Sequence, residues 1–438
     1  MVERQRRGDE RALQHVAGTM SENPDIQAGR TKTGSGTGRP MPSPRLDPRL
    51  RAALLVLPLL VFVGVTFLAP LANMLVRSVY DPVVADTLPE TLERLRAWDG
   101  RGLPEETVYE ALARELLAAR EDRTLGQVAT RVNRVQSGLR SALTRTARRL
   151  RDVDEGPWSE AMTGIHAAWG ETGTWRALRE AGDRYTPRHY LNALDLQRDP
   201  DGSIAFQPED RRIYLFLLWR TLLVSLGVTV LCLLIGYPVA RLIAHAPPRR
   251  ANLLLILVLV PFWTSLLVRT TSWIVLLQNQ GVLNDMFVYL GVIGDDGRLA
   301  MIYNMTGTFV AMTHVLLPFM VLPLYSVMSA IPKVQTSAAE SLGATPWQSF
   351  WRVYWPQTLP GVGAGCLLVF ILAIGYYITP ALVGGSTGQL ISNMIAFHMQ
   401  SSLNWSLAAA LGGILLVCVA GLYVLYDRLV GIERMRLG

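Results

Sequence analysis

The sequence predicts an all-α membrane protein with six transmembrane helices and a large helical insertion between helices 1 and 2. Half of the 438 residues are hydrophobic, 18% are charged, and the mean hydropathy is +0.25. The apolar residues form blocks of about 20 or more, the length that a helix needs to cross a bilayer. Together these observations exclude a disordered chain and an ordinary soluble domain.

The predicted elements follow one another along the chain. Residues 1–51 are charged and then rich in Gly, Ser, Thr and Pro, so they cannot bury enough apolar surface to fold alone and are expected to form a disordered tail. Transmembrane helix 1 is expected over 52–77. Further apolar blocks lie within 214–427, at 214–241, 252–277, 307–330, 361–383 and 406–427. A C-terminal tail, 428–438, follows.

The positive charges of the short connections predict the orientation, because Lys and Arg are enriched on the cytoplasmic side. They precede span one, lie between spans two and three and between spans four and five, and follow span six: Arg45, Arg49, Arg51, Arg249, Arg250, Lys333, Arg352, Arg428, Arg434 and Arg436. An even number of spans puts all these segments on one side. Both termini are therefore expected to be cytoplasmic.

Residues 78–213 form the insertion, which this topology places outside the membrane on the periplasmic side. Residues 81–212 contain 20 Arg and 23 acidic residues, so the basic excess of the chain, +7 overall, borders the apolar blocks. Pro104 before Glu105 and Glu106 predicts a helix start, and apolar residues then recur at helical spacing. Two interpretations remain open: a helical cap that packs on itself and on the outer ends of the spans, or an independent binding module.

The connection at 331–360, between spans four and five, combines the signals of two short helices joined by a tight turn. Pro332 suits the first position of a helix, and Gly343 suits the left-handed residue just past a helix end. Thr345 and Gln348 form a capping box, with Pro346 at the first position of the second helix. Aromatic residues line one face of that helix: Trp347, Phe350, Trp351, Tyr354 and Trp355. A docking element and an amphipathic hairpin in the headgroup region both fit this pattern.

This connection resembles the cytoplasmic coupling loop of type I ABC importer permeases. That family has Glu-Ala-Ala, three residues, Gly and later Leu-Pro; here Ser337 stands in place of the Glu, and Trp355 precedes the later Pro. The resemblance implies that the loop couples to a separate ATPase. The residues that it assigns to this coupling are Ser337, Ala338, Ala339, Glu340, Leu342, Gly343, Ala344, Thr345, Pro346, Phe350 and Pro356.

Other stretches resemble the spermidine/putrescine branch of the family, in particular the first of its two permease subunits. They lie at 261–269, 281–284, 317–326 and 375–380, and the resemblance covers span one and 214–427. It implies the type I permease fold, a polyamine as the solute, and a bacterial inner-membrane location. The implied partners are the lipid bilayer, a second homologous permease subunit, two cytoplasmic ATPase subunits and a periplasmic solute-binding protein, with no nucleic acid.

The chain itself is not expected to be an enzyme. Lys32 and Lys333 are the only lysines, and neither follows a Gly, so the sequence has no Gly-Lys-Ser/Thr phosphate loop. ATP and Mg would bind to the partner ATPase, and no cofactor, catalytic residue or metal site is expected in this chain.

Candidate residues for a translocation path lie in spans three and five: Trp263, Arg269, Trp273, Tyr376 and Tyr377. Arg269 is the one charge well inside a span, where an unpaired Arg costs roughly 2.5–3.5 kcal/mol at a helix centre. Its side chain is expected to reach Asp285 or a loop carbonyl, or else to line the path. Tyr376 and Tyr377 could form an unwound aromatic lining, although plain packing fits equally. His314 fits an interhelical hydrogen bond better than a ligand.

Two alternative functions are open. A secondary transporter would be expected to have inverted repeats, broken helices and buried titratable groups, whereas this sequence has no repeat and no acidic residue deep in a span. An ABC permease for an anionic or amino-acid-like solute would use Arg269 to attract the anion.

Overall fold

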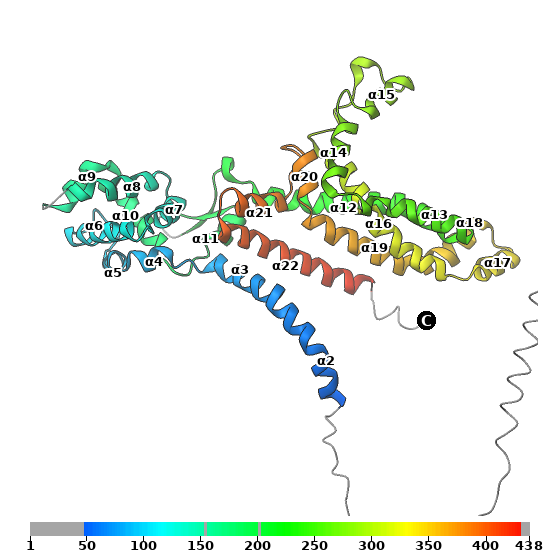
Figure 1. The fold of residues 1–438 in the computed structure, drawn as a ribbon, viewed down its shortest axis with the longest axis horizontal. Helices are drawn as coiled ribbons and strands as arrows, with labels where there is room; N and C mark the ends of the chain where they lie inside the picture. The colour runs from blue at the N-terminus through cyan, green and yellow to red at the C-terminus, as the bar shows by residue number, and fades with distance from the viewer. Residues whose placement is uncertain (1–47, 153–155, 200–202, 431–438) are drawn as a thin grey trace, which may run out of the picture. The chain divides into compact units, whose positions relative to one another are not determined.

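The computed structural model describes residues 48–152, 156–199 and 203–430, and these are mostly helical (Figure 1). In the described part, five helices are long and apolar enough to cross a membrane, and a sixth span is present if one bent pair of helices counts as one. These helices confirm the predicted all-α membrane fold. The chain divides between Phe62 and Val63 into two units, which are described separately.

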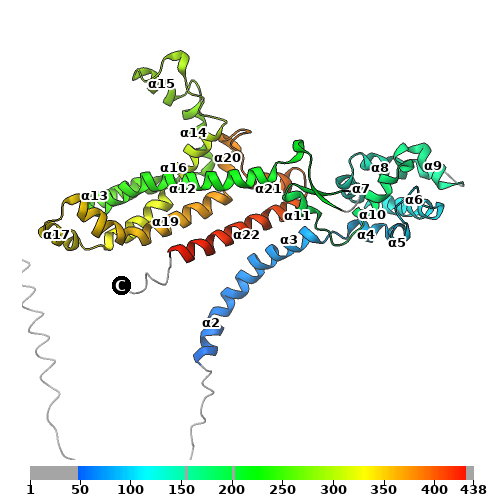
Figure 2. The ribbon, with the colours of Figure 1, turned by 180° about the vertical axis from the view of Figure 1, so that it is seen from behind.

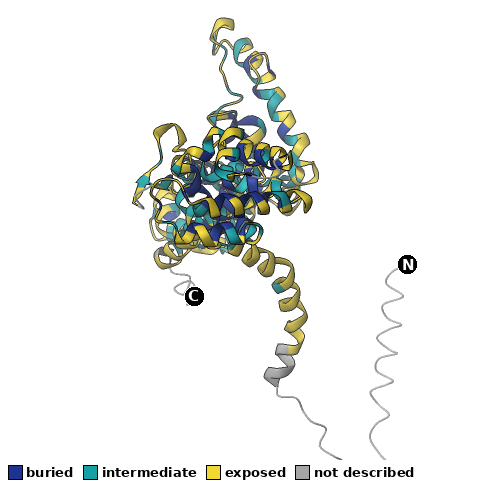
Figure 3. Cartoon of the chain, turned by 90° about the vertical axis from the view of Figure 1, so that its left-hand side faces the viewer, coloured by how far each residue is buried: buried dark blue, intermediate teal, exposed yellow. Residues whose placement is uncertain are grey.

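The first span, Leu54–Val79, consists of helix α2 (Pro48–Val63), a π-helical turn (Gly64–Leu68) and helix α3 (Ala69–Val79). Helix α2 begins inside the predicted tail, whose residues 1–47 lie outside the described part. None of the most apolar stretch of this span is buried within the chain, and most of its described residues have the colour of exposed residues in Figure 3. Such a surface suits lipid or another subunit.

Three helices form the centre of the second unit: α12 (Tyr214–His245), α16 (Met305–Ala330) and α19 (Trp355–Gly375) (Figures 1 and 2). Their shared core includes Val228, Met320 and Val369, each fully buried. The packing of α19 on α16 requires small residues, as a Cβ at Gly365 would lie 2.7 Å from the sulfur of Met320. The glycines of span five therefore serve close helix packing.

The predicted third span, 252–277, is broken, so the expectation of one continuous helix is wrong. Helix α13 (Pro248–Leu259) and a 3₁₀ turn (Val260–Trp263) are followed by α14 (Leu266–Leu277) and α15 (Val282–Tyr289), and the two halves meet at 98°. Pro261 lacks an N–H donor, and Thr264 adopts an extended conformation (ψ 144°). The apolar length of a helix is present, but the backbone turns within it. A 3₁₀ turn (Asp295–Gly297) precedes α16.

The fifth predicted span, 361–383, is also shifted. Helix α19 ends at Gly375, Tyr376 and Tyr377 are not helical, and a short helix α20 (Ile378–Val383) follows. Helix α21 (Ile391–Gln400) leads to the last span, α22 (Trp405–Val430), which continues into the predicted C-terminal tail. Residues 431–438 of that tail lie outside the described part.

The insertion has its own hydrophobic core, which is separate from that of the spans. Its helices are α4 (Val83–Thr87), α5 (Pro89–Ala97), α6 (Glu106–Glu121), α7 (Leu125–Val135), α8 (Leu139–Arg149), α9 (Trp158–Ile165) and α10 (Thr172–Ala181), with 3₁₀ turns at Leu150–Asp152 and Ala167–Gly170. Trp169 and Trp175 are fully buried in this core. Their indole N–H groups donate to the Thr146 hydroxyl (2.8 Å) and the Trp169 carbonyl (3.1 Å) respectively. The helix start predicted at 104–106 is therefore present in α6.

A short connection joins the insertion to the spans through α11 (Arg188–Ala193), strands β1 (Leu196–Arg198) and β2 (Ile204–Phe206), and a 3₁₀ turn (Glu209–Arg211). The strands form an antiparallel hairpin in which Leu196 lies opposite Phe206, an element that the sequence patterns did not predict. Helix α11 packs with the beginnings of α12 and α22, where Ala193, Leu217 and Leu411 share a core. The insertion thus packs on itself, and its helix α11 packs on the ends of two spans.

Candidate functional site

The connection at 331–360 folds as a helical hairpin made of α17 (Lys333–Ser341) and α18 (Pro346–Ser349). Gly343 has a φ of +92°, and its N–H donates to the Glu340 carbonyl (3.0 Å), while the N–H of Ala344 donates to the Ala339 carbonyl (3.0 Å). These two bonds make a Schellman motif, which confirms the predicted left-handed turn. Pro332 precedes the helix as its N-cap and is not its first residue, so that detail of the prediction was wrong.

The second helix begins with the predicted capping box. The N–H of Gln348 donates to the Thr345 hydroxyl (3.3 Å), and the N–H of Thr345 donates to the side-chain carbonyl of Gln348 (3.1 Å). The buried Ser349 hydroxyl also donates to the Thr336 carbonyl of α17 (3.2 Å). The turn, the box and this bond together fix the angle between the two helices.

The second helix is not short, which corrects the expectation of two separate short helices. Helix α18 continues through a π-helical turn (Phe350–Tyr354) into α19, and one helical stretch runs from Pro346 to Gly375. Helix α18 is therefore the beginning of span five. A displacement of the hairpin would be transmitted to that span without a flexible joint.

The aromatic face of this helix connects the hairpin to the end of α12. Successive rings lie in contact, with centroid distances of 5.5 Å for Trp347 and Trp351 and 5.4 Å for Trp351 and Trp355. The guanidinium of Arg241 lies 4.5 Å from the Phe350 ring centroid, a cation–π contact. These contacts attach the hairpin to the C-terminal end of α12, near His245.

Most of the predicted coupling residues are on the surface of the hairpin. The exposed ones are Ser337, Ala338, Glu340, Leu342, Gly343, Thr345, Pro346 and Pro356, and the half-buried ones are Ala339, Ala344 and Phe350. Leu342 is 89% exposed and Trp347 is 69% exposed, although both are large and apolar. An apolar surface of this kind on a rigid hairpin is suited to contact with another protein.

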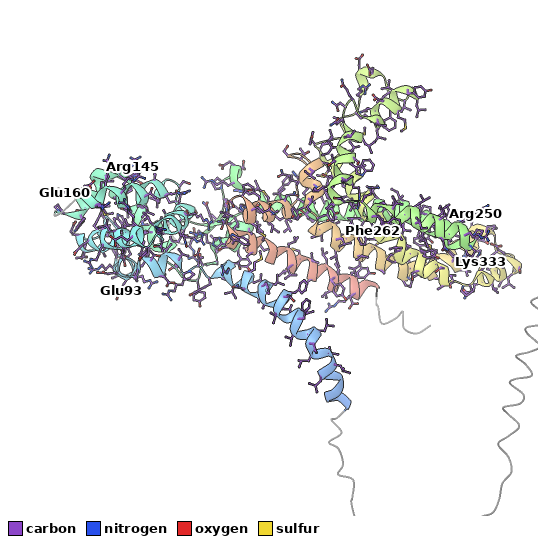
Figure 4. All side chains as sticks on the ribbon, viewed as in Figure 1. Glu93, Arg145, Glu160, Arg250, Phe262 and Lys333 are labelled. Atoms are coloured by element: carbon purple, nitrogen blue, oxygen red, sulfur yellow. The ribbon has the colours of Figure 1, made fainter. Side chains whose placement is uncertain are left out.

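The hairpin and the insertion contact opposite ends of α12. The insertion's Asp195 accepts a hydrogen bond from the N–H of Tyr214 at the first turn of that helix, whereas the hairpin contacts Arg241 near its last turn. The 32 residues of α12 correspond to a length of about 48 Å at 1.5 Å per residue, enough to cross a bilayer. Arg250 and Lys333 lie at the hairpin end (Figure 4).

Arg269 stabilises the broken span rather than forming an ion pair. Its guanidinium donates to the carbonyls of Pro261 and Thr264, the latter at 3.0 Å. The structure therefore supports the expected loop-carbonyl partner but not Asp285, which pairs with Arg298 at 2.7 Å. The Pro261 carbonyl also accepts hydrogen bonds from the N–H (3.3 Å) and the hydroxyl (2.9 Å) of Thr264, so the guanidinium adds to a group of hydrogen bonds that holds the bend.

The other path candidates lie around the two helix breaks. The indole N–H of Trp273 donates to Nδ1 of His314 (3.1 Å), which links α14 to α16 as expected of an interhelical histidine. Arg269 and Trp273 are four residues apart on α14 and so share a face of that helix. Tyr376 lies in the break after α19. Trp263 is 74% exposed at the bend.

The unwound turn at Tyr376 and Tyr377 is held by residues that the sequence patterns did not reveal. The Ser392 hydroxyl donates to the Tyr376 carbonyl, and the Asn393 side chain donates to the Tyr377 carbonyl, each at 2.8 Å. Both partners come from α21, and both bond to backbone carbonyls. Such contacts depend on tertiary packing, and no local pattern indicates them.

The similarity to known proteins lies in the permease region. Residues 213–432 match the family described as "Binding-protein-dependent transport system inner membrane component", and the insertion lies outside that match. The chain is 37% identical over 216 residues to the spermidine/putrescine transport system permease protein PotB of Haemophilus influenzae, covering 49% of this chain and 75% of that protein. It is 38% identical over 213 residues to PotB of Escherichia coli, covering 49% and 76% respectively.

Among solved structures, a bacterial alginate ABC transporter in complex with an alginate pentasaccharide-bound periplasmic protein is similar to this chain. The similarity has a TM-score of 0.39 and 18% sequence identity, and it covers 50% of this chain and 78% of that one.

Proposed function

The chain belongs to the family of binding-protein-dependent transport system inner membrane components, and from that premise we propose that it is a permease subunit of an ATP-driven importer for a polyamine such as putrescine or spermidine. The observation that carries the transport mechanism is the rigid hairpin of α17 and α18, which is continuous with span five. Chemistry on ATP takes place on a partner subunit, which also holds the nucleotide and Mg.

In this proposal the hairpin is the contact with the ATPase. Closure of two cytoplasmic ATPase subunits around ATP moves the hairpin, and α19 carries the displacement towards the break at Tyr376. The aromatic contacts with Arg241 move the end of α12 together with it. A second, homologous permease subunit forms the other half of the path, and a periplasmic binding protein delivers the solute.

The choice of a polyamine is supported by the identity with the two PotB permeases, which are spermidine/putrescine transport proteins by name. In the described residues from 213 onwards, no acidic residue lies deep in a span: Asp285, Asp295 and Asp296 lie between spans three and four, Glu340 lies in α17, and Asp427 lies near the end of α22. A cation passing this subunit would therefore cross aromatic faces such as those of Trp273 and Tyr376. Each cation–π contact contributes about 0.5–2 kcal/mol, weak enough to permit release.

An anionic solute is the opposing possibility, because Arg269 lies beside the path candidates. Its guanidinium already donates hydrogen bonds to the carbonyls of Pro261 and Thr264, so fewer of its N–H groups remain to bind an anion. We therefore assign it to holding the bend of the third span.

Uptake by the reconstituted complex tests the solute class. We expect labelled putrescine and spermidine to be transported in preference to a panel of organic anions. In the Arg269→Gln variant the rate should fall through loosening of the bend, by less than about tenfold since one guanidinium with neutral acceptors is lost, while the preference for polyamines is kept. Uptake of an anion that disappears in Arg269→Gln would overturn the assignment.

Labelling of single cysteines tests the orientation. Residues 137 and 337 are both exposed serines, one in the insertion and one in α17. With the three native cysteines replaced, an impermeant maleimide added to intact cells should label Ser137→Cys at once. Ser337→Cys should be labelled only after the membrane is permeabilised, since the short Arg- and Lys-bearing connections are cytoplasmic. The reverse pattern would contradict both the topology and the coupling role.

A further inference from the structure

A cavity of about 450 Å³ lies where α7, α10 and α11 of the insertion side meet the beginnings of α12 and α22. Its apolar edge includes Tyr214 and Leu407, which belong to the first turns of two spans. The charges around it are unbalanced, because the lining has a single carboxylate, Glu180, and four arginines: Arg134, Arg188, Arg198 and Arg211. The insertion as a whole has more acidic residues than arginines, so this concentration is local.

Two of these guanidiniums have buried N–H groups without a partner. Nη1 of Arg134 and Nη1 of Arg188 are both buried and have no hydrogen-bond partner within the described residues. Glu180 is the carboxylate that approaches Arg188, at 3.9 Å, which is too long for a hydrogen bond. Nη2 of Arg134 donates to the Leu403 carbonyl (3.2 Å), and this hydrogen bond holds the side chain in place. Buried charges left in this condition are unfavourable unless something compensates them.

The groups behind the cavity leave its positive charge unbalanced. Arg131 pairs with Asp81 at 2.6 Å, so that carboxylate is already in an ion pair. His189 is 3% exposed, and both of its ring nitrogens lack a partner among the described residues. Burial and the charge of Arg188 lower the pKa of His189 to about 4, and burial lowers the pKa of Arg134 to about 10. At neutral pH the histidine is therefore uncharged and the arginine is charged.

We propose that this cavity binds an anion that bears a phosphate group, whose charge compensates the guanidiniums of Arg134 and Arg188 and whose oxygens accept hydrogen bonds from the arginines of the lining. Guanidinium groups bind phosphate through charge-assisted and often bidentate hydrogen bonds. Arg211 lines the same cavity and completes the cationic side of the site. Because the cavity adjoins the ends of two spans, the phosphate can come from an anionic lipid headgroup or from free inorganic phosphate.

This site is distinct from the candidate solute path, because its lining contains none of the path candidates of spans three and five. It joins residues of the insertion, Arg134 and Glu180, to Arg188 and Tyr214 next to the spans. An anion bound there would hold the insertion against the outer ends of α12 and α22. The proposal does not depend on which solute is transported.

The test measures thermal unfolding of the purified full transporter complex in nanodiscs of two compositions: phosphatidylcholine alone, and phosphatidylcholine with phosphatidylglycerol. Inorganic phosphate is titrated into the first sample against chloride of equal ionic strength. We expect a saturable rise in the unfolding temperature with phosphate, with phosphatidylglycerol, or with both. A response to phosphatidylglycerol alone identifies a lipid headgroup, and a response in phosphatidylcholine identifies the free anion.

Three variants make the test specific. Arg188→Gln should weaken the apparent affinity by about tenfold, the loss expected for one charge-assisted hydrogen bond. Glu180→Gln should strengthen the apparent affinity, since it removes the only carboxylate of the lining. This variant leaves every buried guanidinium in place, so it tests the proposal without disturbing the fold. Arg145→Gln, an exposed arginine of α8 (Figure 4), should change nothing. Equal responses of all three variants, or no saturable response to either probe, would overturn the proposal.

Discussion

Replacing Gly343 by Val is expected to reduce solute uptake by about tenfold or more while the protein remains in the membrane. Gly343 has a φ of +92°, where a β-branched residue is strained by about 1–3 kcal/mol. A Cβ at this position would meet no atom within 4 Å, so the strain comes from the backbone and not from a clash. Relief of that strain opens the Schellman turn and changes the angle at which α17 is presented.

A second substitution at the same position distinguishes the effect of backbone strain in the turn from the effect of adding a side chain. Gly343→Asn places a side chain at the same open site but tolerates positive φ, so its uptake should stay close to that of the native protein. Uptake and co-purification of the ATPase subunits would be measured together, with membrane insertion checked by the amount of protein in the bilayer. Native levels of both uptake and ATPase association in Gly343→Val would refute the coupling role of this hairpin.

The hairpin could be predicted from the sequence because its determinants are local. The two bonds of the turn at Gly343 span three and five residues, and the capping box joins Thr345 to Gln348. What local signals did not reveal is the continuation of α18 into span five. Pro356 does not interrupt the helix, because it takes the second position of α19 and the π-helical turn before it keeps the helix unbroken.

The bend of the third span could not be predicted from hydropathy. An apolar run of sufficient length satisfies the condition for a span whether the helix is straight or broken, so the run at 252–277 fits both cases. Arg269 illustrates why: its partners are the carbonyls of Pro261 and Thr264, which the bend brings within reach of its guanidinium. The apparent partner, Asp285, is taken by Arg298 from beyond the next helix.

The cationic cavity was hidden from the sequence for a different reason. The insertion is slightly acidic on average, and its arginines lie on several helices far apart in the chain. Only the fold brings Arg134 of α7 and Arg188 of α11 to the same cavity. Composition therefore gave no sign of a cationic site, and the imbalance of charge becomes apparent only in three dimensions.

Replacing Asp195 by Ala is expected to destabilise the junction between the insertion and α12 by about 3 kcal/mol or more. This carboxylate is 2% exposed and accepts hydrogen bonds from three backbone N–H groups at the start of the helix, those of Ile213 (3.1 Å), Tyr214 (3.0 Å) and Leu215 (2.8 Å). Its negative charge also interacts favourably with the positive end of the helix dipole. Ala would leave buried donors unpaired and would be strained at the φ of +55° found there.

Two matched variants show how much of the effect comes from the negative charge of Asp195 and how much from its hydrogen bonds and backbone conformation. Asp195→Asn keeps one carbonyl oxygen and tolerates positive φ, so it should lose about half of the effect or less. Asp183→Ala removes an exposed carboxylate of the insertion and should have none. Limited proteolysis of the full complex would follow cleavage between residues 195 and 213, together with the unfolding temperature. The hydrogen bonds that Asp195 accepts connect the first turn of α12 to the segment that begins β1. Asp195→Ala should therefore be cleaved there many times faster than the other two variants. Equal cleavage rates in the three proteins would mean that the junction is held by the packing of α11 on α22 instead.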